Sequence, residues 1–371
     1  MSSTPRPRKQ EQESARDDVS EVAPGVLRME LPIRMPGLGH VNCYALLDER
    51  GAAVVDPGLP GPRTWRTLRA RLARAGLRVR DVHTVIVTHS HPDHFGGAMR
   101  FARASGARVV AHRSFRFGVT EAVHVHTRPE VSVEDLGAQA DAEGERVAPG
   151  GAAAQQPPEP WGSGRTPWGG EPPRPPLRMR LLWRVARRFG GLGFVPQISD
   201  PVEGGDVLRL AGRDWFVVHT PGHTEDHFCL HDPEDGLFLA GDHVLPTITP
   251  HISGLSSRAD PLAAYFESLD RVAQITPVTR VLPAHGHPFE DLAERCRAIQ
   301  KHHVERLERV KAIGRELGLA SVADYSKHLF KPRSWGSMAD SETYAHLEHL
   351  RLLGDAETRR EADGTLLYTT G

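Results

Sequence analysis

The stretch THSHPDHFGG, residues 88–97, constrains this chain more than any other part of its sequence. It places three histidines and an aspartate within the six positions from His89 to His94. Imidazole and carboxylate groups gain nothing from such crowding in a solvated loop, and burying them without partners costs several kcal/mol. A divalent metal removes this cost, because it takes neutral imidazole nitrogens and carboxylate oxygens as ligands at about 2.0 to 2.2 Å. The stretch therefore predicts a metal site.

Three later segments repeat the context of this cluster. The cluster follows the apolar run VHTVIV, which predicts a strand, and it ends in two glycines. His223 in TPGHTEDH, Asp242 in LAGDH and His285 in LPAHG each lie in a glycine-bearing turn after another apolar run. A lone histidine after a strand is more often an ordinary polar residue than a ligand. Recurrence at four strand ends favours a shared metal site.

Short apolar runs alternate with amphipathic segments along most of the chain, which predicts the α/β class. The expected strands lie at 26–31, 41–47, 52–56, 82–87, 206–210, 214–220, 227–232, 236–242 and 280–286, and the expected helices at 62–75 and 260–275. Beyond them the chain becomes helical at 289–317, 321–330 and 341–353, and it ends in two short strands. Three helices followed by a hairpin predict a winged-helix module at 291–371.

Composition divides the rest of the chain. Residues 1–22 carry charges of both signs and no apolar run, so we expect a disordered tail before a catalytic domain at 23–290. Residues 137–176 are rich in Pro, Gly and Ala, which predicts a disordered insertion. Residues 177–190 show apolar side chains at four-residue spacing with arginines between them. This amphipathic helix is better explained as a packed helix, such as a lid, than as a membrane-surface segment.

The charge balance excludes a global field for nucleic acid or lipid, since 46 Lys and Arg residues face 47 Asp and Glu residues. The three cysteines, Cys43, Cys229 and Cys296, are far apart in sequence and predict neither a disulfide framework nor a thiolate zinc site. They fit a cytoplasmic protein. No segment approaches the roughly 18 apolar residues of a membrane span, and nothing in the sequence indicates a particular oligomeric state.

The order HxHxDH, written here as His89, His91, Asp93 and His94, resembles the signature of the metallo-β-lactamase superfamily. VVDPG at 54–58 and the three later motifs match that family in order, over roughly residues 23–290. The resemblance implies a four-layer αβ/βα sandwich with metals at one edge between its two sheets. It also implies a ligand set: His89, His91 and His223 for one metal, Asp93, His94 and His285 for a second, and Asp242 as a bridge.

Within the superfamily, this motif set resembles glyoxalase II and the β-lactamase-like hydrolases with a C-terminal winged helix. Asp242 stands where the commonest β-lactamases carry a cysteine, so drug hydrolysis is not expected. The resemblance implies two zinc ions, with iron or manganese as alternatives. A hydroxide bridging the ions would attack the carbonyl of a small, anionic ester or thioester, with Asp93 and Asp242 as catalytic residues.

The supporting residues are less constrained by the sequence. Asp56 is predicted to orient the ligand loop rather than to bind metal. His251 follows Asp242 on a loop that should border the pocket, where it either contacts substrate or is structural. His227 either supports the ligands or is a plain strand residue. The histidines at 302, 303, 328, 346 and 349 fall on predicted helices at positions typical of solvent-facing side chains.

Three other functions remain open at this stage. The same metal site suits a phosphodiesterase or an endoribonuclease, with RNA as its substrate. A winged helix also suits a nucleic-acid-binding protein, although the presumed recognition helix SETYAHLEHLRLLGD offers only Arg351 for phosphates or bases. A mononuclear iron dioxygenase uses a similar signature, and metal analysis would distinguish it.

Overall fold

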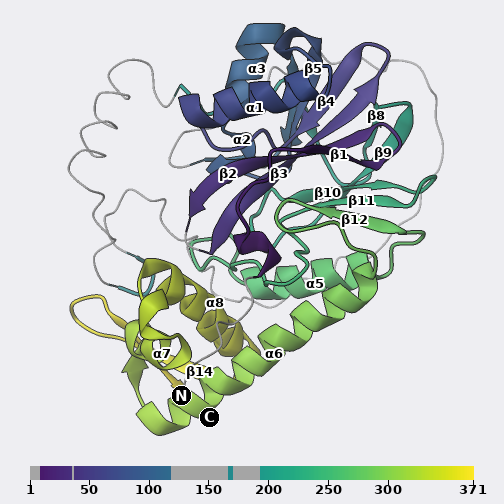
Figure 1. The fold of residues 1–371 in the computed structure, drawn as a ribbon. Helices are drawn as coiled ribbons and strands as arrows, with labels where there is room; N and C mark the ends of the chain where they lie inside the picture. Colours follow the sequence, from purple (N-terminus) through teal and green to yellow (C-terminus); the bar gives the residue numbers. More distant parts are fainter. Residues whose placement is uncertain (1–8, 36, 118–165, 170–192) are drawn as a thin grey trace, which may run out of the picture.

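Two β-sheets lie face to face with helices on both outer faces (Figure 1). The computed structural model describes residues 9–35, 37–117, 166–169 and 193–371. The predicted lid helix at 177–190 lies outside these residues, as does most of the predicted insertion at 137–176. The expected α/β class and four-layer sandwich are confirmed.

The first sheet has seven strands, which follow one another in chain order. The strands from β1 to β4 pair antiparallel, whereas those from β4 to β7 pair parallel. Their bounds are β1 (Val19–Ala23), β2 (Val26–Met35), β3 (Leu38–Asp48), β4 (Gly51–Val55), β5 (Val82–Val87), β6 (Arg108–His112) and β7 (Asp200–Val202).

The second sheet has five strands in the order β12-β11-β10-β9-β8. Because β10 runs antiparallel to both β9 and β11, while β12 runs parallel to β11, the strands β9, β11 and β12 end at the same edge. This edge is where the sequence predicts ligands. The bounds are β8 (Val207–Leu210), β9 (Arg213–His219), β10 (Phe228–Asp232), β11 (Leu237–Gly241) and β12 (Arg280–Pro283).

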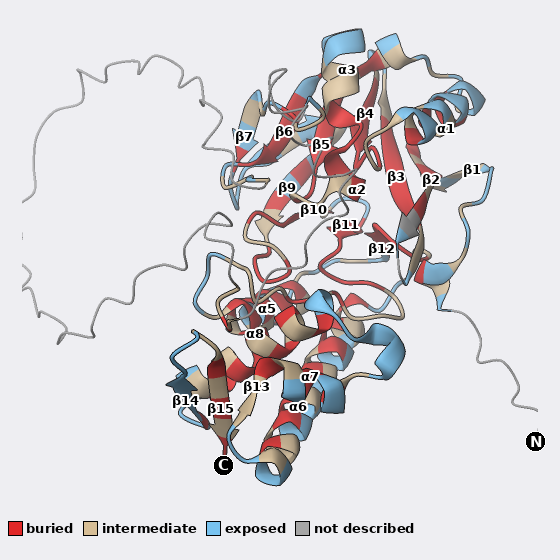
Figure 2. Ribbon diagram, turned by 90° about the vertical axis from the view of Figure 1, so that its left-hand side faces the viewer, coloured by how far each residue is buried: buried red, intermediate tan, exposed pale blue. Residues whose placement is uncertain are grey.

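Alternation along the strands builds three apolar layers. In β3, Tyr44 and Leu46 point into the layer between the sheets, while Cys43 and Ala45 point toward the helices on the outer face. Figure 2 shows the strands of both sheets as predominantly buried. The helices are α1 (Pro62–Arg74), α2 (Pro92–Phe95) and α3 (Ala98–Ser105) beside the first sheet, and α5 (Pro261–Ala273) and α6 (Leu292–Leu317) beside the second.

Below the sandwich, the C-terminal elements form a smaller unit around α6 (Figures 1 and 2). Three helices and a final hairpin occur there, as expected from the sequence, and a short strand adds a third member to the hairpin in the order β13-β15-β14. Its elements beyond α6 are β13 (Ala320–Ser321), α7 (Val322–Leu329), η3 (Pro332–Ser334), α8 (Ser337–Leu353), β14 (Ala356–Arg360) and β15 (Leu366–Thr370). We call residues 291–371 the C-terminal module.

Two segments predicted to be disordered have structure. The N-terminal segment from residue 9 forms η1 (Gln10–Gln12) and then β1, so the prediction of a disordered tail at 1–22 is wrong for these residues. Its anchor is the fully buried carboxylate of Glu11, which accepts hydrogen bonds from both the backbone and the hydroxyl of Thr247. Within the predicted insertion, Trp168 packs in the core of the C-terminal module, and its carbonyl accepts from the amide of Leu366 at 2.9 Å.

The two sheets also meet through a pair of stacked imidazoles. His112 at the end of β6 and His219 at the end of β9 have ring centroids 4.0 Å apart and nearly parallel planes. Burial and the neighbouring His219 lower the pKa of His112 to about 4. This pair therefore favours the folded state when both rings are neutral.

We expect acid to weaken the fold partly through His112. Its pKa falls from 6.5 to about 4 on folding, so its contribution to stability is present above pH 6.5 and is lost as the pH falls toward 4. His112→Phe keeps a stacked ring without a charge, and its free energy of unfolding should fall less over this window. Urea unfolding of both proteins across the window measures this difference, and identical pH dependence would contradict it.

Candidate metal centre

The structure brings all seven predicted ligand residues together at the edge where β5, β9, β11 and β12 end. They fall into two adjacent sets, in each of which the ligand atoms lie within 4.8 Å of one another. We call His89, His91, His223 and Asp242 the first group, and Asp93, His94 and His285 the second group. Six of the seven side chains are buried, and His91 is partly buried.

In the first group, three imidazole nitrogens converge. His91 Nδ1 lies 3.0 Å from His89 Nε2 and 3.1 Å from His223 Nε2. Ligands around one tetrahedral ion at about 2.0 to 2.1 Å are separated by roughly 3.4 Å. Asp242 Oδ2 completes the group at 3.9 Å from His89 Nε2 and 3.7 Å from His223 Nε2. The spacing is that of atoms arranged around a common point.

The second group adjoins the first through the same aspartate. His94 Nε2 lies 3.5 Å from Asp242 Oδ2, and His285 Nε2 lies 3.3 Å from Asp242 Oδ1. Asp93 Oδ2 is 3.6 Å from both of these imidazole nitrogens. The carboxylate of Asp242 therefore borders both groups, and it does so from the second sheet.

Backbone carbonyls fix the protonation of two rings. His223 Nδ1 donates to the carbonyl oxygen of His251 at 2.7 Å, and His285 Nδ1 donates to that of His40 at 2.6 Å. A carbonyl can only accept, so the ring proton of each neutral imidazole is on Nδ1. The Nε2 lone pair of each ring consequently faces the cluster.

A third ring is fixed through a hydroxyl. Thr88 Oγ1 donates to Asp56 Oδ2 at 2.8 Å, and its oxygen therefore accepts from His89 Nδ1 at 3.0 Å. Asp56 Oδ2 also accepts from His94 Nδ1 at 2.8 Å, while Asp56 Oδ1 accepts from the amide of Thr88 at 2.9 Å. Asp56 receives these hydrogen bonds with φ at 51°, a strained conformation for a residue other than glycine. Asp56 thus contacts the His94 ring directly and the His89 ring through Thr88.

The charges of the two groups differ. Burial lowers the pKa of the three histidines of the first group, so they are neutral, as metal ligands must be. Burial acts the same way on His94 and His285, but nearby carboxylates, Asp242 foremost, raise the pKa of both. Burial would raise the pKa of Asp242, and the imidazoles of His285 and His94 instead hold it well below its usual range. The second group therefore attracts a positive charge, either a proton or a metal.

Three buried atoms at the centre of the cluster have no hydrogen-bond partner among the described residues: His94 Nε2, His285 Nε2 and Asp242 Oδ1. Leaving such atoms buried without a partner is costly. A divalent ion accepts electron pairs from nitrogen and carboxylate oxygen alike. The donor set therefore fits a metal centre.

Two further histidines, His227 and His251, support the cluster. The sequence pattern did not predict the contacts through which they do so. His227 Nε2 accepts from the amide of Asp242 at 3.0 Å, and its Nδ1 lies 2.7 Å from Thr220 Oγ1. A Cβ on Gly241 would come within 2.5 Å of His227 Nε2, so a glycine is needed before Asp242. His251 contacts the cluster through its backbone carbonyl. Every residue type has this group, so the sequence could not indicate the contact.

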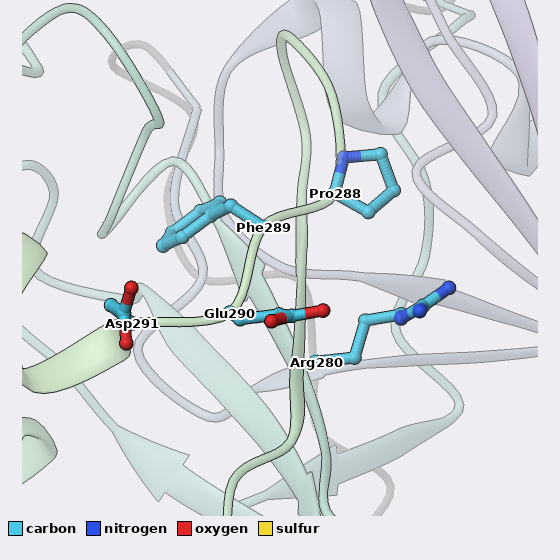
Figure 3. Close-up of a pocket in the computed structure, with 5 residues that line it drawn as sticks. All are labelled: Arg280, Pro288, Phe289, Glu290 and Asp291. Atoms are coloured by element: carbon cyan, nitrogen blue, oxygen red, sulfur yellow. The ribbon is translucent and has the colours of Figure 1, made fainter.

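One surface pocket lies elsewhere on the second sheet. Arg280, at the start of β12, and the segment from Pro288 to Asp291 line a pocket of about 430 Å³ (Figure 3). None of the seven ligand-type residues lines it. This pocket therefore belongs to the outer end of β12 and not to the candidate metal centre.

Curated relatives match parts of this chain. The hydroxyacylglutathione hydrolase of Maricaulis maris is 38% identical over 93 residues, which make up 25% of this chain and 34% of that protein. An acyl-coenzyme A thioesterase of Gallus gallus is 29% identical over 171 residues, 45% of this chain and 55% of that protein. The chain thus spans about a third to a half of the length of these relatives.

The fold is also that of a solved structure. A metallo-beta-lactamase family protein from Thermus thermophilus superposes with a TM-score of 0.68 at 27% identity, covering 95% of this chain and 100% of that chain. The sequence model of the metallo-beta-lactamase superfamily matches residues 36–285. Members of that superfamily generally bind divalent metals, usually zinc. The chain therefore belongs to the metallo-beta-lactamase superfamily.

Proposed function

We propose that this chain is a dinuclear zinc hydrolase that cleaves an ester or thioester of a small anionic substrate. One observation carries the proposal: two adjacent groups of ligand-type atoms share the carboxylate of Asp242. Iron and manganese are alternatives to zinc, since the nitrogen and oxygen donors suit them too.

Each group would hold one ion. His89, His91 and His223 would hold the first, because their three nitrogens converge. The side chains of the second group would hold the other ion, with Asp242 as the bridge between the two. When bound, a pair of divalent ions supplies Lewis acidity and a nucleophile derived from water at neutral pH.

The protein's own groups would orient this centre and keep it charged. Asp93 and Asp242 are the proposed catalytic carboxylates, as both face the point where the groups meet. Two divalent ions carry twice the charge of these two carboxylates, and the surplus favours an anionic substrate. Asp56 is a positioning residue, because its carboxylate holds the His94 ring and Thr88.

The relatives favour a thioester as the substrate. Two of them are named for the hydrolysis of hydroxyacylglutathione and of acyl-coenzyme A, which are both thioesters. When a thioester is hydrolysed, the leaving group is a thiolate. Because a thiol has a pKa of about 8.5, the thiolate leaves with little help from a proton donor.

The C-terminal module suits a supporting role better than the reading of nucleic acid. In α8, which the structure describes throughout, Arg351 is the only Lys or Arg, and it pairs with Glu348 at 2.8 Å. We therefore propose that residues 23–290 form the catalytic domain and that residues 291–371 complete its site. The arginine-rich run at 178–188 lies outside the described residues.

We expect purified protein to contain about two zinc or similar divalent ions per chain, in keeping with a two-metal hydrolase. Asp242→Ala should abolish activity and release at least one ion, since this carboxylate borders both groups. Elemental analysis with an activity assay measures both effects. Asp214→Ala, in an exposed aspartate of the second sheet, is the control. A consistent single iron per chain would contradict the dinuclear proposal.

Asp56→Asn should weaken zinc binding by about 10-fold to 100-fold, the usual effect of losing a partner of a metal ligand. The amide side chain has one acceptor oxygen where the carboxylate offers two, so at least one of the hydrogen bonds from Thr88 or His94 is lost. Competition with a chromogenic chelator measures the affinity. Asp48→Asn, in a carboxylate that pairs with Arg50, should bind zinc as wild type does. Equal affinities in all three proteins would rule out this role.

A panel of acyl thioesters and single-stranded RNA, assayed side by side, tests the substrate class. We expect metal-dependent thioester turnover by wild type and none by His89→Ala, because this substitution removes a ligand of the first group. Metal-dependent cutting of RNA without thioester turnover would refute the ester or thioester assignment and favour the phosphodiesterase.

A further inference from the structure

The position of one proposed ligand depends on a loop of the catalytic domain that packs against the C-terminal module. His223 Nδ1 donates to the carbonyl of His251 at 2.7 Å, so the His223 ring can keep its orientation only if the backbone at residue 251 stays in place. Residue 251 lies on the segment between β11 and α5, which has no regular secondary structure of its own. Contacts with other elements must therefore hold it.

Arg295 of α6 and Glu11 hold the first part of this segment, and α8 supplies the contacts at residue 251 and beyond. The side chain of Glu342 places Oε2 3.4 Å from His251 Nδ1, and its other oxygen accepts from Arg306 of α6. Both Glu342 and Arg306 have largely buried side chains. The carboxylate therefore connects α6, α8 and the loop at one place.

The same loop touches α8 again at Gly254. Its amide donates to Ser341 Oγ at 3.0 Å and lies 3.2 Å from the Ser341 carbonyl oxygen. A Cβ at this position would come within 2.5 Å of Tyr344 Cδ1 and 2.6 Å of the Ser341 carbonyl. At the end of the loop, Asp260 Oδ2 lies 2.9 Å from His349 Nδ1. The loop thus packs closely against about two turns of α8.

The helix that receives the loop is itself fixed. His346 Nδ1 donates to the carbonyl of Glu342 at 2.7 Å, which leaves its Nε2 to accept from His303 Nδ1 at 3.1 Å. His303 and His346 are fully buried and His349 is buried as well, so the prediction of solvent-facing histidines is wrong for these three. This contact between α6 and α8 fixes the position of Glu342, which can then hold the loop in place.

We propose that Glu342 is a positioning residue of the metal centre, which sets the place of His223 through the His251 loop. The inference rests on the proposed function, since it concerns a proposed metal ligand. Glu342 lies beyond residues 36–285, the part of the chain that matches the superfamily. A unit outside the matched region would thus determine how strongly the first group holds its ion, whereas His285 of the second group is oriented by the carbonyl of His40.

Zinc titration of the metal-free protein against a chromogenic chelator tests the proposal. Wild type should bind two ions, and Glu342→Ala should weaken one of them by about tenfold while leaving the other unchanged. Glu342→Gln keeps the size and an acceptor for Arg306, so it should restore most of the affinity. Cobalt in place of zinc should show an altered absorption spectrum in Glu342→Ala, because the ligand geometry of one ion changes.

Glu348→Ala is the matched control. Glu348 lies on the same helix, pairs with Arg351 and has the same 12% side-chain exposure as Glu342, but its other contact is Tyr368 of the hairpin. The control should bind both ions as wild type does. If it loses zinc affinity to the same extent as Glu342→Ala, the effect is one of general stability and the proposal fails.

Gly254→Ala is a second variant that leaves Glu342, Arg306 and His251 intact. The added Cβ should move the loop away from α8 and weaken the same ion, which keeps the proposal testable if Glu342→Ala does not fold. Normal binding of both ions by the folded variants would overturn the role of Glu342. Failure of wild type itself to bind zinc would instead overturn the proposed function, and the inference with it.

Discussion

The arrangement of this molecule depends on one electrostatic constraint: seven ligand-type side chains direct their lone pairs or negative charge to one small buried region. Such groups cannot satisfy one another, because most of them only accept once their rings are neutral. A cation removes this cost. The fold meets the constraint by using β9, β11 and β12, whose ends coincide because they run in the same direction, together with the end of β5 from the opposite sheet.

Orientation of the rings is a separate requirement, and backbone carbonyls meet part of it. A carbonyl oxygen orients an imidazole ring more strictly than a hydroxyl does, because a carbonyl can only accept a hydrogen bond. It therefore fixes which ring nitrogen carries the proton as well as the plane of the ring. The carbonyls of His40 and His251 do this for His285 and His223. Each is in turn held by a segment near one end of the chain. His40 Nδ1 contacts the carbonyl of Glu13 at 2.8 Å, and His251 contacts Glu342.

The sequence predicted the features that local patterns encode and missed those that need a partner far away. Strands and ligand turns could be located because an apolar run followed by a glycine turn is a local signal. The N-terminal segment was missed, since the acidic residue that anchors it, Glu11, finds its partners in Thr247 and Ile248 only after folding. His303 and His346 were assigned to solvent because burial of a histidine needs a partner, and each is the other's partner across two helices. Trp168 was a signal available in the sequence, a large apolar side chain within a Pro and Gly background.

Under the proposed function, metal binding and packing of the C-terminal module form one thermodynamic system. An ion that binds the folded state better than the unfolded state also stabilises the segments that hold its ligands in place. For His223, that segment is the His251 loop. The loop in turn requires α8, through Glu342, Gly254 and Asp260. Such coupling is reciprocal: if docking of α8 raises the affinity for an ion, that ion must strengthen the docking of α8 by the same factor. The C-terminal helices are then part of the metal centre energetically, although no atom of theirs belongs to either group of ligand-type residues.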